Sequence, residues 1–358
     1  MRLTDSANAS MLALNVNGDF PALLAKLLAG DPIDPQHVHE AFGAMLSGAW
    51  TPVQVGAFAV ALRMRGESSE TIAAAVEAMR ATMVPVEHDF PLLVDTCGTG
   101  GDGAHTLNLS SGAAVVVASC GVPVAKHGNR SASSRCGSAD VFEAMGIPLD
   151  IPPSRQRDVL REAGIAFLFA QAHHPALRHA GQARRELGTR TIFNVLGPLA
   201  NPARVTHQLV GVYEDALRPV LARALGSLGV KRAWVVRGED GLDEVSPCAP
   251  TRVSELKPDR NIHEFVIAPE DFGIARTKPD ALAGGDPAEN AQALGAILRG
   301  ENHPAREAVV LNAAAALAVA TADPPRACAQ RARKALDDGA ARHTLERWMR
   351  AARHAQQS

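Results

Sequence analysis

Cysteine, long apolar runs and excess charge of either sign are scarce in this sequence, and each absence argues against a class of protein. The five cysteines are widely spaced and no two form a CxxC pair, so neither a disulfide framework nor a zinc site is indicated. No window approaches the roughly 18 uninterrupted apolar residues of a membrane helix, and the first residues lack the apolar stretch of a signal peptide. We therefore expect a soluble protein of the reducing cytoplasm that does not contact a membrane.

The charge balance gives no sign of a charged macromolecular partner. With a net charge of -2 and a pI near 6.7, the chain has no global basic field for nucleic acid and no acidic tail for a basic partner. Any anion-binding site must therefore be local. At 358 residues the chain is longer than one hydrophobic core usually serves, so two structural domains, or one large domain with a lobe, are expected.

The N-terminal part has a helical pattern. Residues 19–83 carry apolar side chains at helical spacing in several short blocks, which predicts a small helical lobe. Asp34 or Pro35 can begin the second helix. Thr51 can cap the third helix and Ser69 the fourth.

After Pro85 the pattern changes to short apolar runs typical of strands, alternating with helices. That alternation predicts a mostly parallel sheet with crossover helices. The sequence thus favours an α/β fold, with a small helical domain over residues 1–84 and a larger α/β domain over residues 85–358. An amphipathic helix within residues 170–190 is expected to pack back on the helical domain. The candidate strands lie at residues 92–98, 122–128, 207–213, 233–238 and 263–269.

A glycine-rich segment, DTCGTGGDG, follows a predicted strand and precedes a predicted helix. Its glycines fit the spacing G-x-G-x-x-G, but a dinucleotide site would also need an acidic residue after the second strand. That strand instead ends at Lys126, and residues 104–139 contain no Asp or Glu. With Arg130 and Arg135 as further donors and a helix N-terminus near Ser110, this span suits two phosphate groups. The alternative is a glycine-rich turn with ordinary helix caps.

An acidic pair stands far along the chain. Asp243 and Glu244 follow the predicted strand AWVVRG and should lie beyond its carboxyl end, where open α/β sheets bind ligands. One or two carboxylate groups suit magnesium, whose remaining ligands are commonly water molecules and phosphate oxygens of the substrate. The pair could therefore bridge to a diphosphate through Mg²⁺. The alternative is a solvated acidic turn, which is our interpretation of the neighbouring Glu239 and Asp240.

Five segments carry a family resemblance: VDTCGTGGDG, TLNLSS, VAKHGNRSASSRCGSADVFEAMG, RRELGTRTIFNVLGPLANPA and GLDEVSPCAPTRVSEL, in that order. In order and spacing they closely resemble anthranilate phosphoribosyltransferase, an enzyme family of tryptophan biosynthesis. The resemblance covers roughly residues 20–340. Pyrimidine nucleoside phosphorylases share the fold, but the KHGNR element weighs against them.

The resemblance implies a homodimer whose subunits join an α-helical domain, which makes the dimer contact, to an α/β domain of the nucleoside phosphorylase type. It implies 5-phosphoribosyl 1-diphosphate, Mg²⁺ and anthranilate as ligands. The diphosphate-sugar positions are Gly98, Thr99, Gly101, Asp102, Thr106, Asn108, Ser110, Ser111, Lys126, Asn129, Ala132 and Ser133. The magnesium positions are Ser110, Asp243 and Glu244. The anthranilate positions are Gly98, His127, Asn129, His174 and Arg184.

Catalysis is expected to rest on Lys126, Arg184, Asp243 and Glu244. Substitution at the anomeric carbon of ribose is oxocarbenium-like, so the main task is to stabilise the departing diphosphate. A lysine at the end of a buried strand needs an anion to justify its desolvation. Arg184 offers a planar fork for the substrate carboxylate. In the sequence ARRELG it could instead be a solvated residue paired with a nearby glutamate, and His174 could merely cap a helix.

Two positions before the arginine-bearing helix depart from the family pattern. Gln171 replaces a proline and Leu177 replaces a bulky residue, which could reshape the mouth of the acceptor channel. One alternative is therefore a paralogue that uses the same donor with another aromatic acceptor. A non-catalytic nucleic-acid-binding relative is less favoured, because the net charge is near neutral and GTGGDG is intact.

Overall fold

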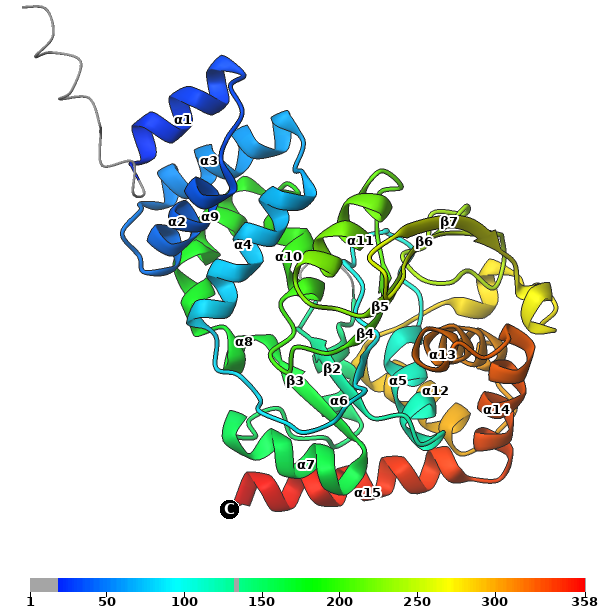
Figure 1. The fold of residues 1–358 in the computed structure, drawn as a ribbon. Helices are drawn as coiled ribbons and strands as arrows, with labels where there is room; N and C mark the ends of the chain where they lie inside the picture. Colours follow the sequence, from blue (N-terminus) through cyan, green and yellow to red (C-terminus); the bar gives the residue numbers. More distant parts are fainter. Residues whose placement is uncertain (1–18, 132–134, 358) are drawn as a thin grey trace, which may run out of the picture. The chain divides into compact units, whose positions relative to one another are not determined.

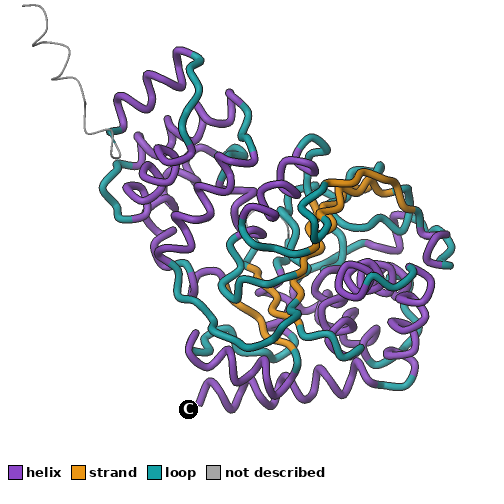
Figure 2. The backbone as a smooth tube through the Cα atoms, in the orientation of Figure 1, coloured by secondary structure: helices purple, strands orange, loops and turns teal. Residues whose placement is uncertain are grey.

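The computed structural model describes residues 19–131 and 135–357, which divide into two compact units. The first unit contains the chain up to Thr82 together with Ala176–Leu196, and the second contains Met83–Pro175 and the chain from Gly197 onward. Figure 2 shows only helices and loops in the described part of the first unit, whereas the strands lie in the second. Among the described residues, no helix is both long and apolar enough to span a bilayer.

The first unit is a helical bundle. Its helices are α1 (Phe20–Ala29), α2 (Pro35–Leu46), α3 (Pro52–Arg65), α4 (Ser69–Thr82) and α9 (Arg178–Leu187), and α10 (Phe193–Leu199) begins in it. Capping side chains fix two of the starts. Asp34 Oδ1 accepts the Gln36 N–H at 2.8 Å, and Thr51 forms a reciprocal capping box with Gln54.

The cap expected for α4 is wrong by one residue. Ser69 is the first helical residue, and the Oγ of Ser68 accepts the Thr71 N–H at 3.2 Å. Both serines precede the same apolar run, so the sequence alone gives little basis for choosing between them.

Helix α9 packs against α2 and α3, although it lies about a hundred residues further along the chain. A Cβ added at Gly56 of α3 would lie 3.7 Å from the Leu187 side chain of α9, an ordinary van der Waals distance that places the two helices in contact. The rings of Phe42 and Phe193 lie 5.6 Å apart between centroids. Aromatic and aliphatic contacts therefore join residues 176–196 to the helical unit.

The second unit is built on a sheet. In the part of the chain that the structure describes, its strands are β1 (Val94–Asp95), β2 (Val124–Gly128), β3 (Ile165–Phe169), β4 (His207–Gly211), β5 (Arg232–Gly238), β6 (Thr251–Leu256) and β7 (Ile262–Ile267). Their spatial order is β3-β2-β1-β4-β5-β6-β7. The pairs from β3 to β5 are parallel, and β6 and β7 add two antiparallel pairs. The prediction of an α/β fold with a mostly parallel sheet is confirmed.

Two of these strands are not among the expected ones. β3 reads IAFLF, a short apolar run that sequence periodicity cannot tell from a buried helix segment. β6 reads TRVSEL, in which polar residues interrupt the apolar pattern. Both are recognised only through their pairing with β2 and β5.

Helices cover both faces of the sheet (Figure 1). The helices of this unit, besides the end of α10, are α5 (Leu109–Ser119), α6 (Ser138–Ala144), α7 (Gln156–Ala163), α8 (Ala170–His173), α11 (Leu217–Ser227), α12 (Pro287–Leu298), α13 (Arg306–Thr321), α14 (Pro325–Asp337) and α15 (Ala340–Gln357). Short 3-10 turns lie at Pro153–Arg155, Pro175–Leu177, Pro269–Phe272 and Pro279–Leu282. Helix α5 packs on β2, whereas α11 packs on β5 and β6. Right-handed crossovers running in opposite directions from the sheet centre place α5 and α11 on opposite faces.

The strand order reverses at β1, which lies between β2 and β4. From β1 the chain crosses through α5 to β2 on one side, and it returns much later to β4 on the other. The loops after β1 and β4 therefore diverge at their carboxyl ends, and such a switch point is where open α/β sheets bind ligands. The glycine-rich segment begins here.

Candidate active site

The glycine-rich loop is fixed to the carboxyl end of β4. The Thr99 N–H donates to the Gly211 carbonyl at 2.9 Å, and the Thr99 Oγ1 accepts the Tyr213 N–H at 3.1 Å. Gly100 and Gly101 have φ values of 67° and 83°, a left-handed conformation that favours glycine. The loop thus presents backbone rather than side chains at the switch point.

The acidic pair contacts this loop directly. Asp243 Oδ2 accepts the Gly100 N–H at 2.7 Å, and Glu244 Oε1 accepts the Ser110 N–H at 3.1 Å at the start of α5. A Cβ at Gly211 would lie 1.5 Å from the Asp243 carbonyl oxygen, so only glycine allows this approach. Segments more than 130 residues apart in sequence therefore meet at one point.

The other two acidic residues of this stretch stabilise a turn. Asp240 accepts the Ser246 hydroxyl at 2.5 Å, and Glu239 pairs with Arg252 at 3.3 Å. Both Glu239 and Asp240 are exposed. They match the solvated acidic turn, whereas Asp243 and Glu244 face the loop.

Burial and mutual repulsion dominate the electrostatics of the acidic pair. Burial raises the pKa of Asp243 well above its usual range, and the charges of Asp102 and Glu244 raise it further. Burial likewise raises the pKa of Glu244 to about 7, against the opposing effect of Lys126 and Ser110. A divalent cation beside these carboxylates would favour their ionised form, so the donor set fits magnesium.

No group of three or more His, Cys, Asp or Glu side chains among the described residues is arranged to hold a metal alone. This does not conflict with the fit, because magnesium commonly takes one or two carboxylates and completes its shell with water and substrate phosphates. The side chain of Ser110 also hydrogen-bonds Glu244. Thus Ser110, Asp243 and Glu244 are brought together.

Lys126 lies near the carboxyl groups of Asp95 and Glu244. Its side chain is buried, and its Nζ donates to the Thr96 carbonyl at 2.6 Å. Its positive charge lowers the pKa of both Asp95 and Glu244, in opposition to their burial. The lysine is therefore the buried counter-charge of two carboxylates.

Asp95 and Asn201 are residues that sequence reasoning missed. Asp95 is fully buried in β1; its Oδ1 accepts the His127 N–H at 3.2 Å and its Oδ2 accepts the Asn201 amide at 2.8 Å. Asn201 also donates to the Ala125 carbonyl at 2.8 Å. Burial raises the pKa of Asp95 to about 6. An aspartate inside an apolar strand, directly before the glycine loop, is the signal that could have identified it.

His127 lies beside His174, with ring centroids 5.2 Å apart. The Nδ1 of His127 donates to the Gly197 carbonyl at 2.9 Å, because a carbonyl can only accept. Its buried Nε2 has no hydrogen-bond partner among the described residues. Burial, and next the charge of His174, lower the pKa of His127 well below its usual range, so the ring is neutral. His174 is itself buried after α8.

One expected phosphate donor is already paired. The Arg130 guanidinium donates to Asp140 at 2.9 Å and to both Glu143 oxygens at 2.8 and 3.0 Å. The span without carboxylates is followed directly by α6, which supplies these two. Asn129 lies at the same strand end, and its Oδ1 accepts the Arg130 N–H at 2.8 Å.

The remaining donor-site candidates lie along the path from the loop into α5. Thr106 forms an isolated bridge with Ala283, and Asn108 donates to the Cys136 carbonyl at 3.1 Å. The Ser111 hydroxyl is buried and has no partner within residues 19–131 and 135–357. Two predicted positions, Ala132 and Ser133, lie outside the described residues.

Arg184 belongs to the helical unit, on α9. Its guanidinium lies over the Phe193 ring, 5.6 Å from the centroid, and burial lowers its pKa. Within the described chain no hydrogen bond or ion pair engages it. Glu186 pairs instead with Gln182 at 2.9 Å, so the solvated Arg–Glu pair is not formed.

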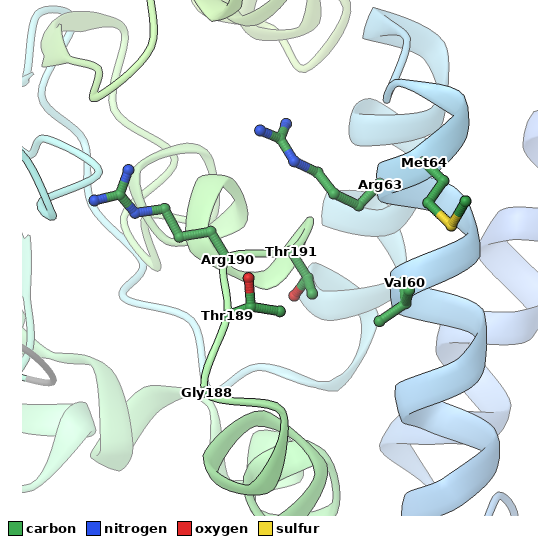
Figure 3. A pocket seen from close by; sticks show the side chains of 7 residues that line it. All are labelled: Val60, Arg63, Met64, Gly188, Thr189, Arg190 and Thr191. Atoms are coloured by element: carbon green, nitrogen blue, oxygen red, sulfur yellow. The ribbon is translucent and has the colours of Figure 1, made fainter.

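The helical unit also contains a cavity of about 540 Å³ between α3 and the segment that follows α9 (Figure 3). Its lining residues are Val60, Arg63, Met64, Gly188, Thr189, Arg190 and Thr191. None of them is a predicted site residue. The sequence-based site and this cavity are therefore different places.

Fold and site define the class of protein. Residues 91–342 match the family model "Glycosyl transferase family, a/b domain", and residues 21–83 match "Glycosyl transferase family, helical bundle domain". The chain is 52% identical to anthranilate phosphoribosyltransferase of Methylobacterium radiotolerans, over 92% of this chain and 95% of the relative. It is 49% identical to the enzyme of Myxococcus xanthus, over 90% and 96% of the two chains. The chain belongs to the anthranilate phosphoribosyltransferase family.

Solved structures agree. Anthranilate phosphoribosyltransferase from Thermus thermophilus superposes with a TM-score of 0.87 at 40% identity, covering 92% of this chain and 99% of that one. The Saccharomyces cerevisiae enzyme in complex with PRPP and Mg has a TM-score of 0.87 at 27% identity, covering 94% and 98%. Both the predicted family and the predicted enzyme class, a transferase, are confirmed.

Proposed function

We propose that this protein transfers the phosphoribosyl group of 5-phosphoribosyl 1-diphosphate to anthranilate, forming N-(5-phosphoribosyl)anthranilate and releasing diphosphate. The observation that carries the proposal is the meeting of the glycine loop and the acidic pair, through Gly100 with Asp243 and Ser110 with Glu244. The family membership supports the same substrates, since one solved structure of the Saccharomyces cerevisiae enzyme is in complex with PRPP and Mg and another is in complex with 4-fluoroanthranilate.

The donor would bind at the switch point of the sheet. The loop glycines, Thr99, Thr106, Asn108 and Ser111 all lie on the segment that runs from the end of β1 into the first turn of α5. Backbone N–H groups and a helix N-terminus favour phosphate oxygens. Ser110, Asp243 and Glu244 would hold Mg²⁺, which when bound neutralises charge on the departing diphosphate.

Lys126 would act on the neighbouring carboxyl groups of the protein and not directly on the substrate. Burial raises the pKa of Asp95 to about 6 and the pKa of Glu244 to about 7, which disfavours their ionised forms. The lysine charge opposes this effect and favours the ionised form that a cation requires. Its removal should therefore weaken cation binding as well as folding stability.

The acceptor reaction needs positioning more than base strength. The amine of anthranilate is neutral at pH 7; its nitrogen forms the bond to the anomeric carbon as the bond to diphosphate breaks, and it then loses a proton. The proposed acceptor residues in the α/β unit are Gly98, His127, Asn129 and His174. Arg184 would bind the acceptor carboxylate with its planar fork. No described residue forms a hydrogen bond or ion pair with its guanidinium, which supports this role.

Steady-state turnover tests the proposal. The purified protein is incubated with anthranilate, the diphosphate sugar and Mg²⁺, and diphosphate release is followed. Anthranilate-dependent release is the expected result. Release with another aromatic amine and none above background with anthranilate would contradict it and favour the paralogue with a different acceptor.

We also propose that the protein is a homodimer in the cytoplasm. Leu28, Val53 and Met64 of the helical unit are 74%, 81% and 83% exposed, and a second copy could cover them. All five cysteines are free thiols, as expected in a reducing compartment. Light scattering coupled to size exclusion tests the dimer, and a monomeric mass at micromolar concentration would contradict it.

A further inference from the structure

A late segment of the chain lies along the path from the glycine loop into α5. The Leu107 N–H donates to the Leu282 carbonyl at 2.8 Å, and the Gly284 N–H donates to the His105 carbonyl at 2.9 Å. A Cβ at Gly284 would lie 2.6 Å from the backbone carbonyl of Thr106, so the two segments touch backbone to backbone. Helix α12 follows this segment and packs against α5 (Figure 1).

Asn290, in the first turn of α12, joins this segment to the donor site. Its side chain is only 2% exposed. Its Oδ1 accepts the Gly285 N–H at 2.7 Å, and its Nδ2 donates to Asn108 Oδ1 at 2.9 Å. Asn108 in turn donates to the Cys136 carbonyl at 3.1 Å. Every amide group in this chain of hydrogen bonds therefore has a defined direction.

The bond from Asn290 changes what Asn108 can do. Asn108 is the N-cap residue of α5, where an asparagine side chain usually accepts an N–H of the second or third helical residue. Among the described residues its side chain makes no such bond, and its Oδ1 points instead toward Asn290, from which it accepts. The N–H of Ser110, the second helical residue, is left for Glu244 at 3.1 Å.

We propose that Asn290 is a positioning residue of the donor site, which holds Asn108 away from the end of α5 and so leaves the Ser110 N–H to Glu244. This inference rests on the proposed function. Without Asn290, the Asn108 carbonyl oxygen turns to cap α5 and competes with Glu244 for the same N–H. Glu244 then loses its hydrogen bond to the start of α5, and the donor site loses its arrangement.

Asn290→Asp tests this with little change in shape. The carboxylate still accepts from Gly285 but can no longer donate to Asn108. We expect the KM for the diphosphate sugar to rise about ten-fold while the KM for anthranilate changes less than about two-fold, as expected for one lost hydrogen bond. Ile297→Val, on the same buried face of α12, is the matched control, since it lowers stability without touching Asn108.

A double-mutant cycle with Asn108→Ala separates positioning from general destabilisation. If Asn290 acts through Asn108, then Asn290→Asp has no further effect on donor KM once Asn108 is alanine. If the increases in donor KM from the two substitutions multiply in the double variant, the proposal is overturned. It is also overturned if Asn290→Asp is as thermally stable as Ile297→Val and its donor KM equals that of wild type. Should Asn290→Asp not fold, Asn290→Ser, whose hydroxyl is too short to reach Asn108, carries the same expectations.

Calorimetric titration with Mg²⁺ and inorganic diphosphate provides a readout that does not depend on the acceptor. Weaker diphosphate binding by Asn290→Asp than by wild type supports the proposal, and equal binding contradicts it. Absence of turnover with anthranilate in the wild type would instead contradict the proposed function. The two failures are thus distinguishable.

Discussion

The donor loop of the α/β unit and Arg184 of the helical unit differ in how their polar groups are satisfied. In the loop, backbone N–H groups and carboxylates bind one another, as in the 2.7 Å bond from Gly100 to Asp243. Arg184 is desolvated over Phe193, and no described residue bonds its guanidinium. The loop thus bonds its polar groups internally, whereas the Arg184 guanidinium presents donors that no described residue uses.

This difference predicts different consequences of mutation. Changing a loop residue leaves another protein group unpaired and affects both stability and donor binding. Changing Arg184 removes a group whose desolvation is unfavourable, so the folded state loses little and only a ligand contact disappears.

The double change Asp243→Asn with Glu244→Gln should reduce magnesium-dependent turnover by on the order of 100-fold or more, since a metal contributes several kcal/mol of charge stabilisation. Both amides can still accept from Gly100 and Ser110, so the fold should persist. Because burial raises the pKa of both carboxyls, their ionisation is unfavourable in the folded state, and neutral amides avoid it. The melting temperature should therefore stay the same or rise.

Turnover at a series of magnesium concentrations and a thermal melt check this prediction. Asp240→Asn is the neighbouring control, since Asp240 belongs to the turn and bonds Ser246. Activity that survives in the double variant would remove the acidic pair from the mechanism. Loss of the fold would show that these carboxylates are structural.

Arg184→Ala should raise the KM for anthranilate by about 10- to 100-fold, the range expected for hydrogen bonds between charged groups. The KM for the donor should change little. Arg185→Ala is the matched control, because Arg185 is the next residue on α9 and is exposed. An equal rise in KM for both substrates would show that α9 has a structural role and that the acceptor site lies elsewhere.

Gln171→Pro tests whether Gln171 determines the preference for the aromatic acceptor. Gln171 is the second residue of the short helix α8, where proline removes no helical hydrogen bond. The variant should therefore fold and keep turnover with anthranilate, with a change in the ratio of rates for anthranilate and ring-substituted analogues of less than about ten-fold. Loss of anthranilate turnover with gain for another aromatic amine would show that Gln171 sets a different acceptor preference.

The sequence predicted those parts of the site that depend on local pattern. The glycine loop, the absence of carboxylates in residues 104–139 and the position of Asp243 after a strand each follow from short-range chemistry. The starts of α2 and α3 were likewise predicted from their capping residues, Asp34 and Thr51. These features needed no knowledge of tertiary contacts.

The rest depended on tertiary contacts, some between residues close in sequence and others between residues far apart. That Arg130 is bound by Asp140 and Glu143 follows from the turn of the chain into α6. Asp95 reads as one polar residue in an apolar strand until Asn201 is seen beside it. Pairings across a hundred residues or more leave no periodic signal in a single sequence.

The two ends of strand β4 differ in their relation to the site. Gly211 at the carboxyl end faces the site, whereas His207 at the amino end is buried beside Thr206, whose hydroxyl lies 2.8 Å from its Nδ1. Burial, and next the charge of Arg232, lower the pKa of His207 to about 4. In the unfolded chain a histidine has a pKa of about 6.5. Between these values only the unfolded chain binds the proton, so folding stability falls as pH drops from about 6.5 to about 4.

His207→Gln should remove this part of the pH dependence. Urea unfolding at about pH 7, 5.5 and 4.5 should show a smaller loss of stability on acidification in the variant than in wild type. Turnover at neutral pH should change less than about two-fold, because the residue lies at the far end of the strand from the glycine loop. An equal acid slope in both proteins would assign the loss of stability to other groups. A large loss of turnover would mean that the two ends of β4 are coupled.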